Sequence, residues 1–372
     1  MKKYIGHITF ILAYIVIIVL INSNLEFAKP GDYPEGLKYA KAEVTKILEN
    51  NMGEDPDYPY IRIGKQNLEM KLLSGEHKGE VIEVLNYVTR TMRLEAEEGD
   101  VFIVGSYDEY ITTTVMHRER SSLLYGLGIF FVALVILFGQ KKGVASIAGL
   151  VVTLVNVVFV FMPLLINGVP AIPAAIGVVM VSTLYTMVAL NGVCGKSIIA
   201  TICCTVCTII AGVLAYVVGA IGDISSLNTP EVEDLLFITE NCAFRIDNLL
   251  IAGILISALG AVMDTSMSVV SAMFEIKEQH PAISSKQLFK SGINIGKDMM
   301  GTMTNTLVLA FVGASINSVV IYYMYRMPYI SLMNTDFMVV EVVKGLVGSI
   351  AVVLSIPMAA MMTSTYFRKK NN

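Results

Sequence analysis

The chain has 372 residues, of which 55% are hydrophobic and only 16% are charged, and its net charge is −4. A soluble domain carries about 25% charged residues, so the composition excludes an ordinary soluble protein, and the small acidic balance argues against a nucleic-acid-binding surface. The charges crowd into residues 33–120 and a few short clusters. The stretches between them are apolar over about 18 residues or more, which is long enough to cross a lipid bilayer.

The first apolar stretch, residues 5–21, follows two lysines and fits either a signal peptide or a membrane anchor. No small-x-small cleavage site is evident before Ala28. We therefore expect an uncleaved anchor helix over residues 1–32, and we count it as the first of about eight transmembrane helices.

Residues 33–120 carry the signals of short β-strands. Apolar Leu68, Met70 and Leu72 alternate with charged residues, which is the period of a half-buried strand, and glycine-containing turns separate the strands. The segment contains no cysteine, so disulfides do not hold it together. We expect a small β-barrel-like domain of the OB or SH3 type. Its acidic segment, residues 53–60, is interpreted as a loop in preference to a calcium site.

Seven further apolar stretches complete the expected transmembrane domain, residues 121–372. They lie at residues 122–138, 144–166, 170–190, 197–220, 248–274, 299–323 and 341–366. Lysine and arginine concentrate in alternate loops, and such loops face the cytoplasm. This pattern predicts a polytopic α-helical membrane protein with both termini in the cytoplasm and residues 33–120 outside it.

Two loops have helical signals of their own. Pro230 is followed by two acidic residues, as at a helix N-terminus, which predicts a short outer-surface helix over residues 230–240. Ser284 with Gln287 three residues later fits a capping box and predicts an amphipathic cytoplasmic helix.

The sixth expected span carries a stripe of small and polar residues, namely Gly253, Ser257, Gly260, Asp264 and Ser268. Steps of three and four place them on one face of a helix. Small residues let another helix approach closely, whereas a carboxylate in hydrocarbon costs about 2.5 kcal/mol or more unless it is paired or hydrated. We therefore expect Asp264 to face a polar path or, alternatively, a structural partner.

The seventh span supplies polar residues at a matching depth, namely Asp298, Thr302, Thr304 and Asn305, beside Gly301 for close packing. Because the two spans are antiparallel, these oxygens can meet Asp264. Carboxylate, amide and hydroxyl oxygens are the ligands of a hard cation or the members of a proton relay. The alternative is that the threonines and Asn305 only hydrogen-bond between helices, while Asp298 pairs with Lys297.

Other chemistries have weaker support. Five methionines flank the same region, and thioethers suit Cu(I), but methionine is also an ordinary core residue. Cys203, Cys204 and Cys207 occupy one helical turn without a histidine, which favours packing over metal binding. The motifs of intramembrane aspartyl proteases, ATPases, zinc peptidases and serine hydrolases are absent. We therefore expect no enzyme and no resident cofactor, and the identity of any bound metal stays open.

Four runs in and beside the sixth and seventh spans form a recognisable pattern. The runs are Gly260-Ala261-Val262-Met263-Asp264, Leu288-Phe289-Lys290-Ser291-Gly292, Asn294-Ile295-Gly296-Lys297-Asp298 and Met300-Gly301-Thr302-Met303-Thr304-Asn305-Thr306-Leu307. The pattern resembles the YibE/F family of bacterial membrane proteins, and the resemblance extends to residues 348–350 and, more loosely, to the soluble β domain. It implies a protein of the bacterial plasma membrane and brings no activity, substrate or site residue with it.

Two functions are consistent with these residues. The first is a transporter or channel-like protein for an ion or small solute, in which Asp264 binds the cation or proton. The second is an assembly protein, or the permease subunit of a larger complex, whose residues 33–120 recruit a protein partner or a second copy of the chain. Both place the chain in a lipid bilayer.

Overall fold

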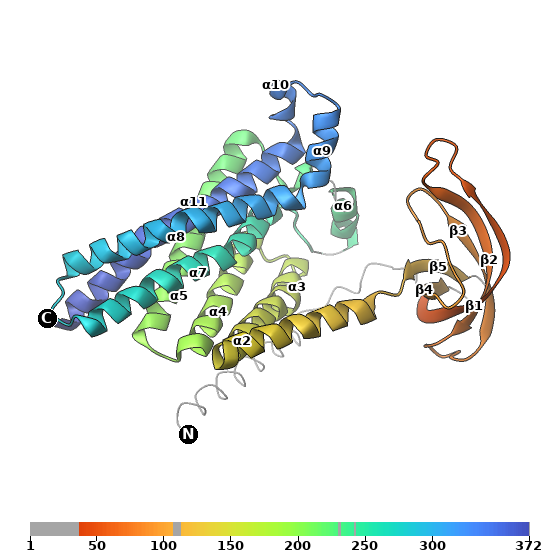
Figure 1. The fold of residues 1–372 in the computed structure, drawn as a ribbon. Coiled ribbons are helices and arrows are strands. Elements are labelled where there is room, and N and C mark those ends of the chain that lie inside the picture. The colour runs from red at the N-terminus through yellow and green to blue at the C-terminus, as the bar shows by residue number, and fades with distance from the viewer. Residues whose placement is uncertain (1–36, 107–112, 230–231, 242, 372) are drawn as a thin grey trace. The chain divides into compact units, whose positions relative to one another are not determined.

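The computed structural model describes residues 37–106, 113–229, 232–241 and 243–371. They fall into two compact units, a β unit within residues 32–134 and a helical unit within residues 135–372 (Figure 1). The anchor helix expected over residues 1–32 lies outside the described residues.

The β unit is a single antiparallel sheet with the strand order β3-β2-β1-β4-β5, curved into a half-barrel. The strands are β1 (Lys38–Glu54), β2 (Arg62–Leu72), β3 (Val81–Val88), β4 (Val101–Ser106) and β5 (Thr113–Arg118). Leu68, Met70 and Leu72 of β2 are fully buried, as their alternation with charged residues predicts. The central strand β1 pairs with both β2 and β4, and two register shifts in its pairing with β2, after Val44 and after Ile47, mark β-bulges of the kind that bend a strand.

The acidic loop after β1 is built around a buried carboxylate. Asp55 accepts backbone hydrogen bonds from Asp57 and Tyr58 at 2.8 and 3.1 Å. The Arg90 guanidinium binds both oxygens of Asp55, with Nε 2.5 Å from Oδ2 and Nη2 2.8 Å from Oδ1, and lies over the Tyr58 ring. These donors occupy the carboxylate oxygens that a calcium ion would need. The loop is therefore held by the Asp55–Arg90 ion pair, in agreement with its interpretation as a loop in preference to a calcium site.

The helical unit consists of long helices and short connecting ones, and the first of them, α2, begins in the β unit. They are α2 (Ser121–Asn156), the π-helix η1 (Val157–Phe161), α3 (Met162–Ile166), α4 (Ala171–Asn191), α5 (Gly195–Gly222), the 3₁₀-helix η2 (Ser226–Asn228), α6 (Val232–Asn241), α7 (Leu249–Gln279), α8 (Ser285–Ala314), α9 (Ile316–Met324), α10 (Tyr329–Leu332) and α11 (Asp336–Asn371). The short helix expected near residues 230–240 is α6, and the Ser284–Gln287 capping box opens α8 as predicted.

Within the described residues, five helices are long and apolar enough to cross a membrane, or six if the bent pair α8–α9 is one span. The first of them, Ser121–Ile166, has 46 residues and contains a break. At Gln140 the backbone leaves the helical region, with φ 47° and ψ −127°. Just beyond the break, a side chain at Gly143 would collide with the carbonyl group of Val135. Only a glycine at position 143 can lie this close to the backbone of Val135, which indicates that the chain turns back sharply between these two residues.

The span expected over residues 299–323 is not one straight helix, because α8 and α9 meet at an angle of 64°. The break lies at Ser315, whose backbone N–H donates to Phe311 O and whose hydroxyl donates to Glu341 of α11 at 2.9 Å. The partner that holds Ser315 is thus 26 positions away in the sequence, where no helical periodicity could reveal it.

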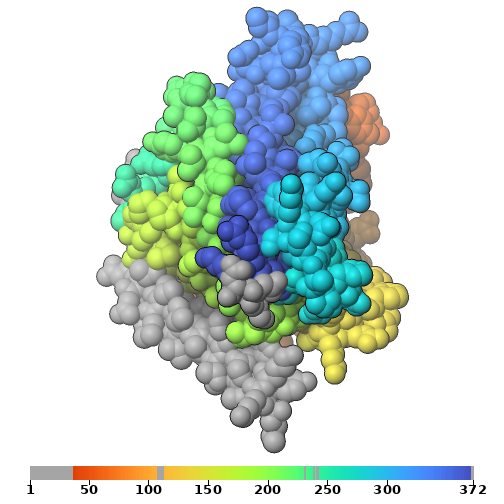
Figure 2. Space-filling model, turned by 90° about the vertical axis from the view of Figure 1, so that its left-hand side faces the viewer, coloured from red at the N-terminus to blue at the C-terminus, as the bar shows by residue number. Residues whose placement is uncertain are grey.

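Helix α5 lies at the centre of the helical unit and packs against α4, α7 and α11. Helix α11 in turn lies between α5 and α8, as the dark blue band between green and cyan in Figure 2 shows. Among the described residues, α8 packs mainly on α11 and less on α7, so a large part of its surface is free of helix contacts within the chain.

Replacing Arg90 by leucine should destabilise the β unit in a pH-dependent way. Hydrogen bonds from Arg90 hold the pKa of the Asp55 carboxyl below its ordinary value. A lowered native pKa stabilises the fold above the ordinary aspartate pKa, and this gain is lost as the pH falls through the native value. Hydrogen exchange of β-unit amides in the full chain should therefore be faster in R90L at pH 7, and the difference from wild type should narrow below about pH 4.

Arg62→Leu is the matched control, because the Arg62–Glu95 ion pair is partly exposed and contributes little. Equal acceleration of exchange in R62L and R90L, or a difference that does not depend on pH, would contradict this role of Asp55.

Candidate functional site

Helix α7 presents the expected stripe of small and polar residues on its surface. Gly253, Ser257, Gly260 and Asp264 are all exposed, and Ser268 is half-buried. The opposite face of α7 is buried in the core through apolar residues such as Leu255 and Val262. Asp264 is therefore accessible from outside in the helical unit that the described residues form.

Helix α8 has a similar outward polar face. Asp298, Thr302 and Asn305 are exposed, and they lie opposite Gly292 and Gly296, which face the core. The hydroxyls of Thr302 and Thr304 donate to carbonyls of their own helix, 2.9 Å from Met299 O and 2.7 Å from Met300 O. Their lone pairs stay available to a further donor or to a cation.

The contacts between α7 and α8 place these two faces at the same depth. Gly292 of α8 lies against Met273 of α7. Asp264 lies nine residues before Met273 in α7, and Gly301 lies nine residues after Gly292 in α8. Because the two helices are antiparallel, Asp264 and Gly301 are at the same level. A second contact gives the same register, because Ala258 and Leu307 both lie beside Gly348 of α11. The structure therefore brings Asp264 and Thr302 to one level, although no hydrogen bond or ion pair among the described residues joins them.

The glycines of α7 and α8 are of two kinds. At Gly292 and Gly296 an added Cβ would collide with Met273 and Ile356 respectively, so both permit close helix packing inside the chain. At Gly253, Gly260 and Gly301 an added Cβ would meet no atom within 4 Å. The small residues expected to pack a helix closely thus line an open surface of this chain.

A chain of buried thiols and hydroxyls crosses the centre of the helical unit. Thr183 of α4 donates to Cys204 of α5 at 3.5 Å, and Ser266 of α7 donates to Cys203 at 3.6 Å. The Cys203 thiol donates to Ser355 O of α11 at 3.6 Å. Cys203, Cys204 and Cys207 are fully buried. Each contact joins two helices, which is how polar side chains hold membrane helices together.

No group of three or more His, Cys, Asp or Glu side chains within the described ranges is arranged to hold a metal ion. Three of the methionines near Asp264, namely Met263, Met267 and Met303, are partly buried and pack against the hydrophobic core. Met267 also accepts a hydrogen bond from Asn191 of α4 at 3.5 Å.

One polar cluster was not predicted from the sequence. Glu341 of α11 accepts from Ser315 and pairs with Lys344, with Oε1 2.7 Å from Nζ. Both charged side chains are partly buried. The signal in the sequence was a pair of opposite charges three residues apart, but Glu341 stands at the edge of an apolar stretch, where a charge is usually solvated.

A protein-family model described as YibE/F-like protein matches residues 127–369 of the chain. No curated protein and no solved structure matches it. The matched segment contains the α7 and α8 faces described above and starts after the β unit's last strand.

Substitution of the two kinds of glycine separates internal packing from the open surface. Gly296→Leu should lower the apparent midpoint of thermal unfolding in detergent, because overpacking against Ile356 costs about 1–3 kcal/mol. Gly301→Leu on the same helix should leave the midpoint nearly unchanged. A larger loss in G301L than in G296L would show that this register of α8 is wrong.

Proposed function

The chain belongs to the YibE/F-like family, and we propose that it is a membrane transport protein for an ion or small solute, with a polar site centred on Asp264. In this proposal Asp264 binds the cation or proton. Thr302, Thr304 and Asn305 of α8 supply further oxygen ligands. Asp298 lies at the cytoplasmic entrance, and Ser268 lies one turn from Asp264 on α7.

One observation carries the proposal: a carboxylate is exposed on the surface of a long apolar helix. A charge at this depth facing lipid costs about 2.5–3.5 kcal/mol, so intramembrane carboxylates face water, a partner or an ion. Helix α8 exposes an amide and hydroxyls at the same level as Asp264. Two polar faces on adjacent helices can border one path, whereas a purely structural Asp264 would be paired, and no hydrogen bond or ion pair joins it to another side chain among the described residues.

We place the protein in the bacterial plasma membrane with eight spans, both termini in the cytoplasm and the β unit outside. The distribution of lysine and arginine between loops supports this orientation. The length of Ser121–Ile166 supports the count, since 46 helical residues extend about 69 Å and a bilayer core is about 30 Å thick. Divided at Gln140, this segment provides two spans, and α8 with α9 provides one.

Asp264→Asn should strongly reduce transport. In proteoliposomes loaded with dyes for protons and for alkali and divalent cations, the flux of the transported ion should fall about tenfold or more, because the amide loses the charge that holds the cation. Such a loss corresponds to about 1.4 kcal/mol or more. Asp234→Asn, on the exposed side of α6, is the control and should keep wild-type flux. Unchanged flux in D264N would exclude Asp264 as the ion site.

The second candidate function is an assembly protein, or the permease subunit of a larger complex, in which the β unit recruits a partner. The edge strand β3 favours it, because Val81, Leu85 and Tyr87 are exposed on one face of that strand. Exposed apolar side chains on an edge strand are a common feature of strand-to-strand binding surfaces.

A double variant, Leu85→Ser with Tyr87→Ser, tests this second function. If the β unit recruits a protein, affinity purification of the variant after crosslinking should lose that protein while ion flux is unchanged. Lys71→Ser, a substitution at an exposed position of the neighbouring strand β2, should retain it. If the double variant still retains that protein, the exposed β3 surface is excluded as its binding site.

A further inference from the structure

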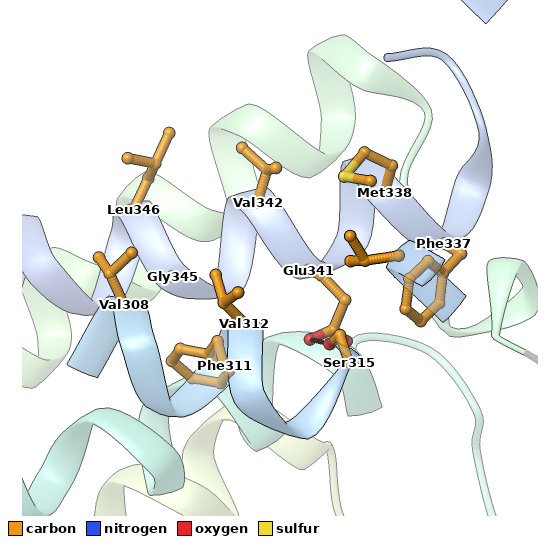
Figure 3. Close-up of a pocket in the computed structure, with 11 residues that line it drawn as sticks. Val308, Phe311, Val312, Ser315, Phe337, Met338, Glu341, Val342, Gly345 and Leu346 are labelled. Carbon is orange, nitrogen blue, oxygen red and sulfur yellow. Dashed lines mark hydrogen bonds between the residues drawn. The ribbon is translucent and has the colours of Figure 1, made fainter. Parts of the chain in front are cut away.

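The break between α8 and α9 opens a groove on the helical unit. A straight helix would continue along α11, but the chain bends by 64° at Ser315. The Ser315 hydroxyl donates to Glu341 Oε2 at 2.9 Å, and Figure 3 shows the two side chains pointing at each other across the groove. This hydrogen bond ties the bend to α11 at one end of the groove.

The walls of the groove are almost entirely apolar. It encloses about 150 Å³, and Ser315 and Glu341 are the polar side chains among its lining residues. Phe311 and Val312 of α8 line it together with Val342 and Leu346 of α11 (Figure 3). Gly345 has no side chain to fill the groove. The space beside it is open, because an added Cβ would touch only Phe311, at 3.8 Å.

Glu341, at the polar end of this groove, pairs with Lys344, which lies beside it on α11 outside the groove lining. Glu341 Oε1 is 2.7 Å from Lys344 Nζ. The side chain of Glu341 is 19% exposed and that of Lys344 is 27% exposed. A carboxylate has about four acceptor positions and an ammonium has three donors. Both groups can therefore make further contacts outside the pair, the carboxylate with a cation and the ammonium with an anion.

The depth of the pair matches the level of lipid headgroups. Glu341 lies five residues from the start of α11 at Asp336, or about 7–8 Å along the helix axis. Just before α11 in the chain, Tyr323, Tyr325 and Tyr329 are exposed to 75–80%. Exposed tyrosines gather where a membrane meets water. The apolar groove thus runs into the bilayer from a charged end at its surface.

We propose that this groove binds one zwitterionic phospholipid. An acyl chain fills the apolar part between Phe311 and Leu346, the amine of the headgroup lies against Glu341 and the phosphate lies against Lys344. Charge complementarity selects this occupant, since a carboxylate that lines the groove and the ammonium group paired with it lie side by side. The inference is independent of the function proposed for Asp264.

Native mass spectrometry of the purified full-length chain tests the site, with phosphatidylethanolamine and phosphatidylglycerol added separately. Wild type should retain one phosphatidylethanolamine and bind phosphatidylglycerol about tenfold more weakly, because Glu341 repels a headgroup without an amine. Lys344→Gln and Glu341→Gln should each weaken phosphatidylethanolamine binding about tenfold, which corresponds to about 1.4 kcal/mol. Lys369→Gln, at the other end of α11, should bind as wild type does.

Gly345→Leu provides a test that leaves both charges in place. The leucine fills the groove without disturbing the Glu341–Lys344 pair, so the lipid should be lost while the thermal midpoint of the chain in detergent is kept. Equal binding by wild type and G345L would overturn the proposal, as would equal binding of the two lipids to wild type. A wild-type chain that retains no phospholipid would overturn it as well.

Discussion

The hydrocarbon core of a bilayer offers no hydrogen-bond partners, and this constraint decides where each polar side chain of the helical unit can lie. Buried hydroxyls and thiols meet it inside the protein, where Thr183, Cys203 and Ser266 join α4, α5, α7 and α11 in pairs. Among the described residues, Asp264 and Asn305 do not meet it, because both are exposed. Water, an ion or a further polar group must therefore face them, and that is why they are the candidates for function.

Glycine divides the helical unit in the same manner. Gly292 and Gly296 let α8 lie against α7 and α11, and this contact sets the register that brings Asp264 level with Gly301. Gly253, Gly260 and Gly301 have open space beside them. Internal packing and the proposed site therefore occupy different faces of the same two helices, and a substitution on one face need not disturb the other.

Local sequence patterns predicted much of the fold. Contacts between residues distant in the sequence could not be predicted from such patterns. Leu68, Met70 and Leu72 enter the core as their alternation requires, and Ser284 caps α8 through a residue three positions away. The bend at Ser315 depends on Glu341, and the burial of Asp55 depends on Arg90, 35 residues later. The facing of Asp264 was equally out of reach, because helical periodicity identifies a stripe but not whether a neighbouring helix covers it.

The most direct test of the account is an electron cryomicroscopy map of the full chain in a lipid nanodisc, at a resolution that separates water from acyl chains. If Asp264 binds a transported ion, a water-filled path should be bordered by the carboxylate of Asp264 and the amide of Asn305, at the level of Gly301. Ordered acyl chains packed directly against Asp264 and Asn305 would contradict it, because a carboxylate that faces lipid binds no transported ion.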